Sequence, residues 1–124
     1  MRTVSSPPQT TDGAYADAKE VIGQRRILYI SGQVPETPEG YVPQDFEDQA
    51  RLVFKNIRAL LTSAGMELRN LVKITIYLSD RKYRSTLATV RNEILAGHEV
   101  ALTIVIAGIY EPGWLLEIEA VAAD

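Results

Sequence analysis

The chain has 124 residues, with 13 Lys and Arg, 16 Asp and Glu, one His and no Cys, which gives a formal net charge of −3. This length predicts a single domain, and the lack of Cys excludes disulfides, a thiol nucleophile and Cys-based zinc sites within the chain. The acidic balance argues against nucleic acid as a partner, because nucleic-acid affinity comes largely from Lys and Arg that neutralise phosphates. With one His, no paired-His metal motif exists either, and no glycine-rich phosphate loop suggests a nucleotide cofactor, so we expect no metal and no cofactor.

Residues 1–12 are rich in Ser, Thr and Pro, and we expect a flexible N-terminal tail there, followed by a single domain over residues 13–124. The longest apolar stretch, Ile104 to Tyr110, is far shorter than the roughly 20 residues that span a bilayer. The N-terminus lacks the apolar core of a signal peptide. We therefore expect a cytoplasmic protein with no membrane partner.

The first half of the domain is predicted to contain two strands and a helix. A strand over 15–21, a turn at Gly23–Gln24 and a strand over 26–31 come first, and the proline-rich stretch 34–43 is a loop. Apolar residues then recur between Phe46 and Ala64 at the spacing of one helix face. Asp45 is placed to cap the start of this helix, and Gly65 is placed for a left-handed residue at its end.

The second half is predicted to continue with strand, helix, strand and strand. Residues 72–78 alternate in polarity as a half-buried strand does, residues 81–96 form a helix that Gly97 ends, and strands follow over 100–109 and 114–122. Pro112 and Gly113 suit the central positions of a type II turn. The order β-β-α-β-α-β-β indicates an α+β fold, and right-handed crossovers put both helices on one face of a mixed sheet.

The other face of this sheet is predicted to lie against a second copy. The strand over 100–109 is apolar on both sides, with Leu102 and Ile104 in one set and Val105 in the other. A chain of this size cannot cover both faces by itself. We therefore predict an oligomer with sheets facing inward across the subunit interface.

Several sequence blocks, in this order and spacing, are typical of one family. They are Gly13-Ala14-Tyr15, Tyr29 to Pro35, Gln49, Asn56-Ile57, Ala64-Gly65, Leu71 to Leu78 and Leu116 to Ala122. With them the chain resembles, from about Gly13 to Ala123, the YjgF/RidA family of small trimeric proteins with a chorismate-mutase-like fold. The resemblance therefore implies a homotrimer.

The resemblance also implies a reaction. Active members hydrolyse reactive enamines and imines to ketoacids and ammonia, without metal or cofactor, in clefts between subunits. Glu117 takes the place of the family glutamate that positions or activates water, and Tyr15 and Ser31 match residues that line the cleft. The implied partner is a small-molecule substrate or ligand.

The chain departs from the family at the arginine that grips the substrate carboxylate. In Ala101-Leu102-Thr103 this place is held by Leu102. A hydrogen bond to a charged group contributes roughly 1.5–3 kcal/mol. The resemblance therefore implies an altered substrate preference: carboxylated imines bind poorly, and Leu102 with Ile104 forms an apolar wall.

Arg91 has two interpretations. It falls inside the apolar arc of the second predicted helix, between Leu87 and Leu95. Its stem could pack while its head reaches water or an interface carboxylate. Alternatively, Arg91 restores a cation near the arginine that is missing.

The other candidate residues also have structural explanations. Glu117 and Glu119 share a strand face and are either a solvated pair or a site carboxylate with a neighbouring charge, an arrangement typical of a general acid or base. The Ser31 hydroxyl either caps a turn or contacts substrate, and Tyr15 either packs at an interface or contacts substrate.

Two other functions stay open on the sequence. One is a trimer that binds small metabolites without chemistry. The other is an endoribonuclease-like activity, suggested by the basic and aromatic cluster Asp80 to Arg84 and by the ribonuclease name that the family has carried. A single basic cluster on an acidic chain is weak support for RNA binding.

Overall fold

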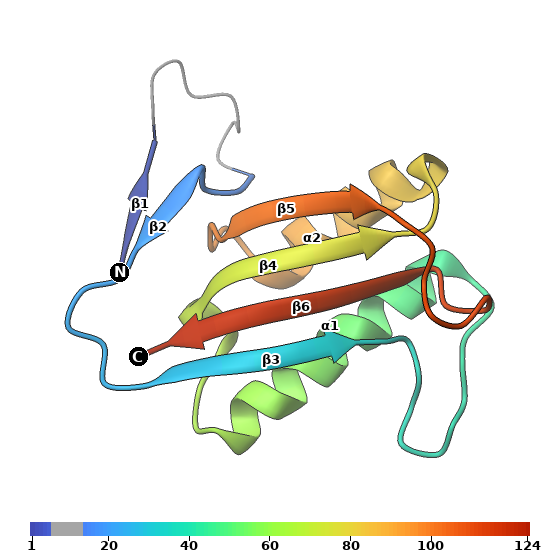
Figure 1. Cartoon of the computed structure of the whole chain (residues 1–124), viewed down its shortest axis with the longest axis horizontal. Coiled ribbons are helices and arrows are strands. Elements are labelled where there is room, and N and C mark those ends of the chain that lie inside the picture. The colour runs from blue at the N-terminus through green and yellow to red at the C-terminus, as the bar shows by residue number, and fades with distance from the viewer. Residues whose placement is uncertain (6–13) are drawn as a thin grey trace.

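Four strands form the main sheet, in the order β3-β6-β4-β5, and a separate two-stranded ribbon, β1-β2, stands beside it (Figure 1). The structure is a computed structural model and describes residues 1–5 and 14–124. The strands are β1 (Arg2–Val4), β2 (Ala18–Glu20), β3 (Ile27–Gln33), β4 (Leu71–Leu78), β5 (Ala101–Ile106) and β6 (Leu116–Ala123). The helices are α1 (Phe46–Ser63) and α2 (Arg84–Leu95), with short 3-10 helices η1 (Leu68–Asn70) and η2 (Arg81–Tyr83).

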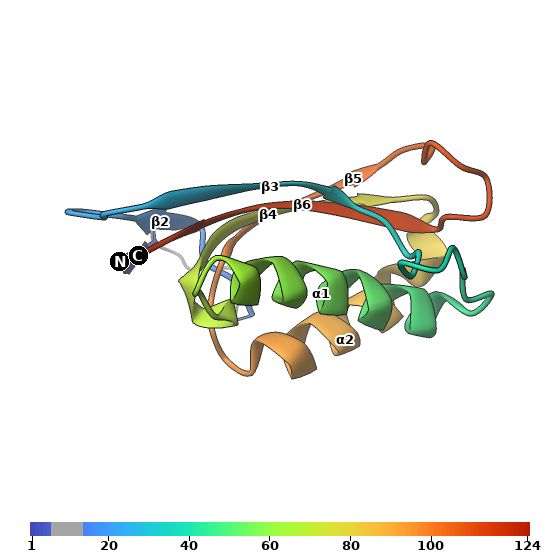
Figure 2. The same cartoon turned by 90° about the horizontal axis from the view of Figure 1, so that it is seen from below.

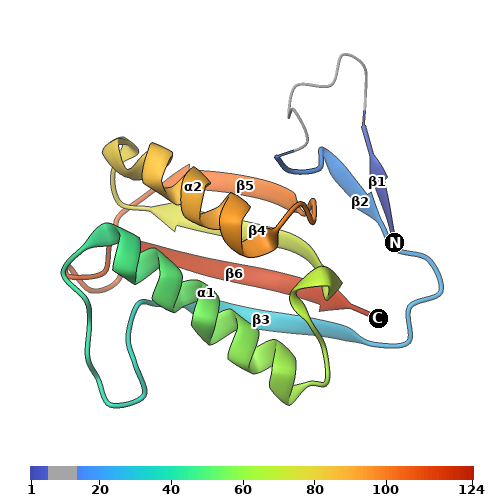
Figure 3. The ribbon, with the colours of Figure 1, turned by 180° about the vertical axis from the view of Figure 1, so that it is seen from behind.

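Both helices cover the same face of the main sheet, as predicted, and leave the other face open (Figure 2). Seen from behind, α1 crosses β3 and β6, whereas α2 crosses β4 and β5 (Figure 3). Strand β6 runs antiparallel to β3 and β4, and β4 runs parallel to β5, so the sheet is mixed. The α+β fold class is confirmed.

The helix boundaries follow the capping signals in the sequence. The Asp45 carboxylate accepts a hydrogen bond from the backbone N–H of Asp48 at 3.2 Å, which satisfies a free donor at the start of α1. Gly65, just beyond the end of α1, has φ +72°, a conformation that glycine adopts without steric cost. Helix α2 begins three residues later than predicted, because the Asp80 side chain caps a 3-10 turn instead.

Alternation along the strands divides the sheet into a buried helix face and an open face. Ile74, Ile76 and Leu78 of β4 and Leu116 and Ile118 of β6 are fully buried under the helices. The residues between them, such as Lys73, Thr75 and Tyr77 or Glu117 and Glu119, are more exposed and belong to the open face. This division decides which candidate residues can meet.

The predicted pairing of the first two strands is wrong. β2 pairs with β1 rather than with β3, and the register joins Arg2 to Glu20 and Val4 to Ala18. The reason lies at Ala16, whose N–H donates to the Val100 carbonyl at 2.8 Å and ties this segment to β5. β5 and β3 are opposite edges of the sheet, so one short segment cannot pair with both.

Strand β1 lies in the segment where we predicted a tail, and residues 6–12 of that segment are outside the described residues. A turn forms over Glu111–Trp114, as predicted, with the Trp114 N–H donating to the Glu111 carbonyl at 3.0 Å. The type II assignment is wrong, because Gly113 does not have the positive φ that this turn type requires at its third position.

A buried glutamine fixes the loop between β5 and β6 to the start of α1. The Gln49 side chain, 1% exposed, donates to the carbonyls of Pro43 and Gly113 at 2.7 and 2.9 Å. Its Oε1 accepts from the Leu115 N–H at 2.8 Å. This side chain therefore sets where β6 begins, directly before Glu117.

Candidate functional site

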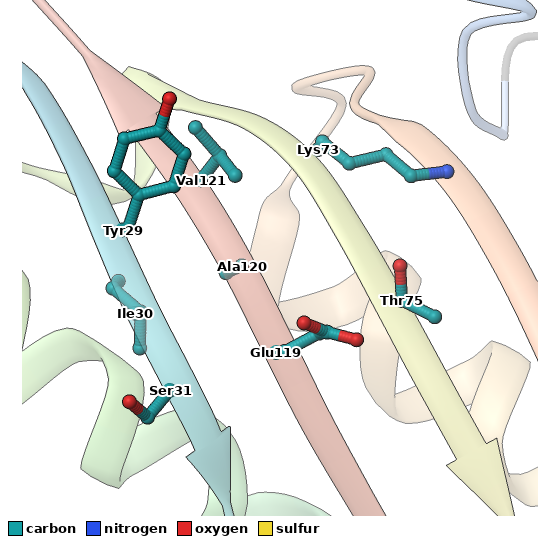
Figure 4. Close-up of a pocket in the computed structure, with 8 residues that line it drawn as sticks. All are labelled: Tyr29, Ile30, Ser31, Lys73, Thr75, Glu119, Ala120 and Val121. Atoms are coloured by element: carbon teal, nitrogen blue, oxygen red, sulfur yellow. The ribbon is translucent and has the colours of Figure 1, made fainter.

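A hollow of about 390 Å³ lies on the open face of the sheet across β3, β6 and β4 (Figure 4). Its lining mixes polar and apolar side chains: Tyr29, Ile30, Ser31, Lys73, Thr75, Glu119, Ala120 and Val121. Tyr29 is 75% exposed and pairs across the ladder with Val121. Ser31 is exposed at the end of β3, and its backbone carbonyl accepts a hydrogen bond from Gln33 at 2.9 Å.

A second hollow, of about 290 Å³, adjoins the first and contains Glu117. Its lining residues are Gly32, Tyr77, Gly108, Ile109, Glu117 and Glu119, so Glu119 is shared between the two hollows. Glu117 projects from β6 on the open face, opposite Tyr77 of β4. Ser31 and Glu117 thus lie on neighbouring parts of one surface.

Tyr77 and Glu119 form a hydrogen bond across the two strands. The tyrosine hydroxyl donates to Glu119 Oε1 at 2.5 Å. This bond, with smaller contributions from burial and from the charges of Glu119 and Glu117, raises the pKa of Tyr77 above its usual value. Of the two glutamates, Glu119 is held by a hydroxyl, and Glu117 forms no hydrogen bond to another described residue.

The Glu117 carboxylate lies directly against the backbone of β3 at Gly32. A Cβ atom placed on Gly32 would stand 1.9 Å from Glu117 Oε2, closer than any real contact. The register between β3 and β6 shifts between Ile30 and Gln33, which marks a β-bulge at this point. The missing side chain and the bulge together make room for the carboxylate.

Four other candidate residues lie elsewhere, on and beside β5. Leu102 and Ile104 are in register with the core residues Ile74 and Ile76, so they belong to the helix face. Leu102 is half-buried against the core, whereas Ile104 is 37% exposed at the sheet edge. Strand β5 pairs with β4 on one side, and on its outer edge the described residues contribute only the isolated bridge at Ala16.

Tyr15 and Arg91 complete this second group. Tyr15 precedes Ala16, which is bonded to β5, and it is close enough to Arg91 to act electrostatically on its pKa. Arg91 lies on the inner side of α2 and is 5% exposed. Burial lowers its pKa, and the influence of Tyr15 opposes that effect.

The six candidates therefore form two groups in one chain. Ser31 and Glu117 are on the open face, at the end where β3 stops and β6 starts. Leu102 and Ile104 are on the opposite face and β5 is separated from β6 by β4. A single chain does not bring the two groups together.

Two residues of the Glu117 surface were missed as site residues. Tyr77 was predicted only as part of an alternating strand, and Gly32 only as the end of one. The alternation of β4 does place Tyr77 on the side of Lys73 and Thr75, so its face was predictable. Its meeting with Glu119 was not, because the register of two strands far apart in sequence decides it.

The cluster Asp80 to Arg84 does not present a free aromatic ring. Tyr83 stacks on Phe46 of α1, with ring centroids 4.4 Å apart and planes 5° apart. Lys82 is positioned over the same tyrosine ring at 5.2 Å. A ring that packs between helix residues is not available to stack on a base, so this cluster gives little support to RNA binding.

Within residues 1–5 and 14–124, no three His, Asp or Glu side chains gather in a way that could hold a metal ion. In the same part of the chain, neither helix combines the length and apolar character that crossing a bilayer requires.

Comparison with known proteins finds a matching protein family and related proteins. The model of the family described as Endoribonuclease L-PSP matches residues 8–124. A RutC family protein of Aquifex aeolicus is 34% identical over 121 residues, covering 96% of this chain and 94% of that protein. TdcF of Escherichia coli, named a putative reactive intermediate deaminase, is 28% identical over 92 residues, covering 73% of this chain and 71% of its own.

Solved structures share the fold. The structure of E. coli TdcF with bound serine has a TM-score of 0.75 at 26% identity and covers 98% of this chain and 91% of its own. The structure of the Rid family protein YyfB of Yersinia pestis has a TM-score of 0.88 at 23% identity, and the match covers 99% of this chain and 98% of that chain. At that identity the second comparison speaks for the fold alone.

Proposed function

Because the chain belongs to the Endoribonuclease L-PSP family, the YjgF/RidA family, we propose that it hydrolyses small reactive enamines and imines to a carbonyl compound and ammonia. The observation that carries this proposal is Glu117, a partly exposed carboxylate in a hollow with no hydrogen bond to another described residue. The name of TdcF, a putative reactive intermediate deaminase, supports the same chemistry.

The proposed reaction needs one proton carrier. Glu117 accepts a proton from water as the water oxygen attacks the carbon of the C=N bond of an imine, and it passes this proton to the nitrogen, which gives a carbinolamine. The carboxylate then takes the proton of the carbinolamine hydroxyl and delivers it to the nitrogen as the C–N bond breaks, so that ammonia leaves, a C=O group remains and Glu117 is again ionised. No metal or organic cofactor takes part in this scheme.

We propose that each site is shared between two chains of a homotrimer. This follows from the two separate groups: Ser31 and Glu117 of one chain would face Tyr15, Arg91, Leu102 and Ile104 of the next. Ser31 and Tyr15 would contact the substrate, and Leu102 with Ile104 would form an apolar wall. Because Leu102 replaces the arginine that grips the substrate carboxylate in other family members, the substrate preference would differ from theirs.

The test is ammonia release from freshly generated imines, both carboxylated and uncharged. We expect hydrolysis above the spontaneous rate, and Glu117→Gln is expected to lower it by about 10²- to 10⁴-fold, the usual contribution of a general acid or base. Glu39→Gln, on an exposed loop, is the matched control. No release from any imine would contradict the reaction and would favour a trimer that only binds its ligand, as TdcF with bound serine illustrates for binding.

A mixing experiment tests the shared site. Glu117→Gln and Tyr15→Ala are each expected to be inactive, but each leaves one group intact. Unfolding and refolding the two variants together would regenerate complete sites at about a quarter of the interfaces if association is random. If mixed chains stay inactive although they associate, the two groups do not belong to one site.

A further inference from the structure

Three side chains that form strong hydrogen bonds line the hollow that contains Glu117. They are Tyr77, Glu117 and Glu119. The other lining residues are two glycines and an isoleucine, which carry no polar side-chain atom. Within the described part of the chain, a water molecule in this hollow therefore meets the polar side chains of these three residues alone.

The strand register brings Tyr77 and Glu117 opposite each other. Tyr77 of β4 pairs with Glu117 of β6 in the antiparallel ladder, and both residues are half-buried on the open face. The pKa of Tyr77 is raised first by the hydrogen bond to Glu119, then by burial and by the charge of Glu119, and finally by the charge of Glu117. Glu117 is therefore close to Tyr77, and a water commonly bridges two polar groups placed in this way.

The bond to Glu119 decides what Tyr77 can offer to such a water. A tyrosine hydroxyl has one proton to donate and lone pairs that accept. Tyr77 donates its proton to Glu119 Oε1, and an ionised carboxylate has no proton to give in return. The direction of this bond is therefore fixed, and the Tyr77 oxygen is left as an acceptor for a third group.

We propose that Glu117 and Tyr77 together hold the water that attacks the C=N bond, and that Glu119 is a positioning residue that acts through Tyr77. This inference rests on the proposed function and adds two residues to it. The water donates one proton to Glu117 and the other to the Tyr77 oxygen. Both protons are then engaged, and a lone pair of the water oxygen is free for the substrate carbon.

The protons of the attack step are accounted for by this arrangement. As the new C–O bond forms, one water proton passes to Glu117. The other stays on the oxygen as the carbinolamine hydroxyl, which is still bonded to Tyr77. Tyr77 keeps its own proton in the bond to Glu119 throughout, and its raised pKa favours this, because a phenol that holds its proton does not compete with Glu117 as the base.

Removing the Tyr77 oxygen tests its role in the reaction. Tyr77→Phe is expected to lower kcat for imine hydrolysis by about 3- to 10-fold, the contribution of one hydrogen bond, and to change KM little, because the water rather than the imine loses a contact. Tyr41→Phe is the matched control, since Tyr41 is 65% exposed on a loop, and it should keep full activity. An unchanged kcat in Tyr77→Phe would overturn the proposal.

Substitutions of Glu119 test whether it acts through Tyr77. In Glu119→Ala the Tyr77 proton is free to turn toward the water, so the water is oriented wrongly and kcat should fall about as much as in Tyr77→Phe. Glu119→Gln should retain more activity, because its amide oxygen can still accept from the hydroxyl. Added to Tyr77→Phe, Glu119→Ala should cost nothing more. A further loss of the same size would overturn the role of Glu119.

A crystal structure of the intact protein that resolves ordered water tests the same arrangement without any reaction. We expect a water oxygen about 2.6–3.2 Å from both the Glu117 carboxylate and the Tyr77 hydroxyl, and we expect Tyr77→Phe to lose it. A water that contacts Glu117 alone, or no water at all, would overturn the proposal even in an active protein. A bridging water in a protein that releases ammonia from no imine would instead reject the proposed reaction and keep the water site.

Discussion

At the scale of single residues, the contacts of the neighbouring residues explain why the Glu117 carboxylate is accessible. The Tyr77 hydroxyl donates a hydrogen bond to the Glu119 carboxylate. Gly32 has no side chain, which leaves space for the Glu117 carboxylate against the backbone of β3. Glu117 is therefore the glutamate of this pair that remains available to water. The two adjacent carboxylates differ because of these contacts, although they share one strand and one face.

Gly32→Ala is expected to keep the fold and lose the activity. The new Cβ would meet Glu117 Oε2, the far end of a flexible side chain, so the carboxylate must move while the backbone stays. Imine hydrolysis should fall toward the level of Glu117→Gln, and the melting temperature should change little. Gly113→Ala, which meets nothing within 4 Å, is the control.

A double variant makes this prediction specific. In a Glu117→Gln background, Gly32→Ala should reduce the residual rate no further, because the group that it displaces is already disabled. An additional loss of the same size in that background would show that Gly32 acts by another route.

Tyr77 is expected to lose its proton at higher pH than an ordinary tyrosine. The hydrogen bond to Glu119 favours the neutral phenol and raises the pKa of Tyr77. Folded-state stabilisation from this bond is complete below the unfolded pKa of about 10 and is lost as pH rises through the higher folded value. Ultraviolet titration of the phenolate should show a late step, which Tyr77→Phe removes and Glu119→Gln shifts to lower pH; an unchanged late step in Glu119→Gln would contradict this.

At the scale of elements, the site depends on how α1 fixes two loops. Gln49 points from α1 into the protein and bonds to Pro43, Gly113 and Leu115. These bonds hold the chain that leads into β6 and so the position of Glu117. The capping residues and the apolar face of α1 define the helix. The loop that leads into β6 is held in place by the buried side-chain amide of Gln49.

Gln49→Leu is expected to lower the free energy of unfolding by about 2–4 kcal/mol, because the Leu115 N–H and two carbonyls lose their partner in a buried place. Urea denaturation measures this loss. Gln44→Leu, an exposed residue just before the helix, is the control and should change stability little. A loss of less than about 1 kcal/mol for Gln49→Leu would mean that water replaces the amide.

At the scale of the whole molecule, both helices lie on one face of the sheet, and none of the described helices covers the open face (Figure 2). It carries exposed apolar side chains, among them Ile27, Tyr29 and Val105, together with the polar residues around Glu119. The proposed homotrimer would bury this face and bring the two groups of candidate residues together.

Val105→Glu is expected to break the assembly into smaller species, because it places charge on the open face. Leu60→Glu makes the same kind of change at an exposed position of α1 and should leave the assembly intact. Sedimentation at micromolar concentration gives the mass of each protein. A single-chain mass for the unchanged protein would contradict both the trimer and the shared site.

The sequence by itself determined the local features. Periodicity and capping residues determined α1 and β4, because hydrogen bonds within the helix and alternation along a strand depend only on neighbouring residues. The same alternation put Glu117 and Glu119 on one face. The order of the predicted elements determined the α+β fold class, and the family blocks indicated which residues to examine.

Only the tertiary structure decided which distant residues meet. The pairing of β2 with β1, the Tyr77–Glu119 bond and the contact of Glu117 with Gly32 all depend on strand register across long stretches of sequence. The split of the candidates between two sheet faces depends on it too. The burial of Arg91 without a hydrogen-bond partner for its Nε among the described residues is also a result of packing. A helical pattern shows on which side of the helix a residue lies, but it does not show whether a residue of opposite charge lies nearby.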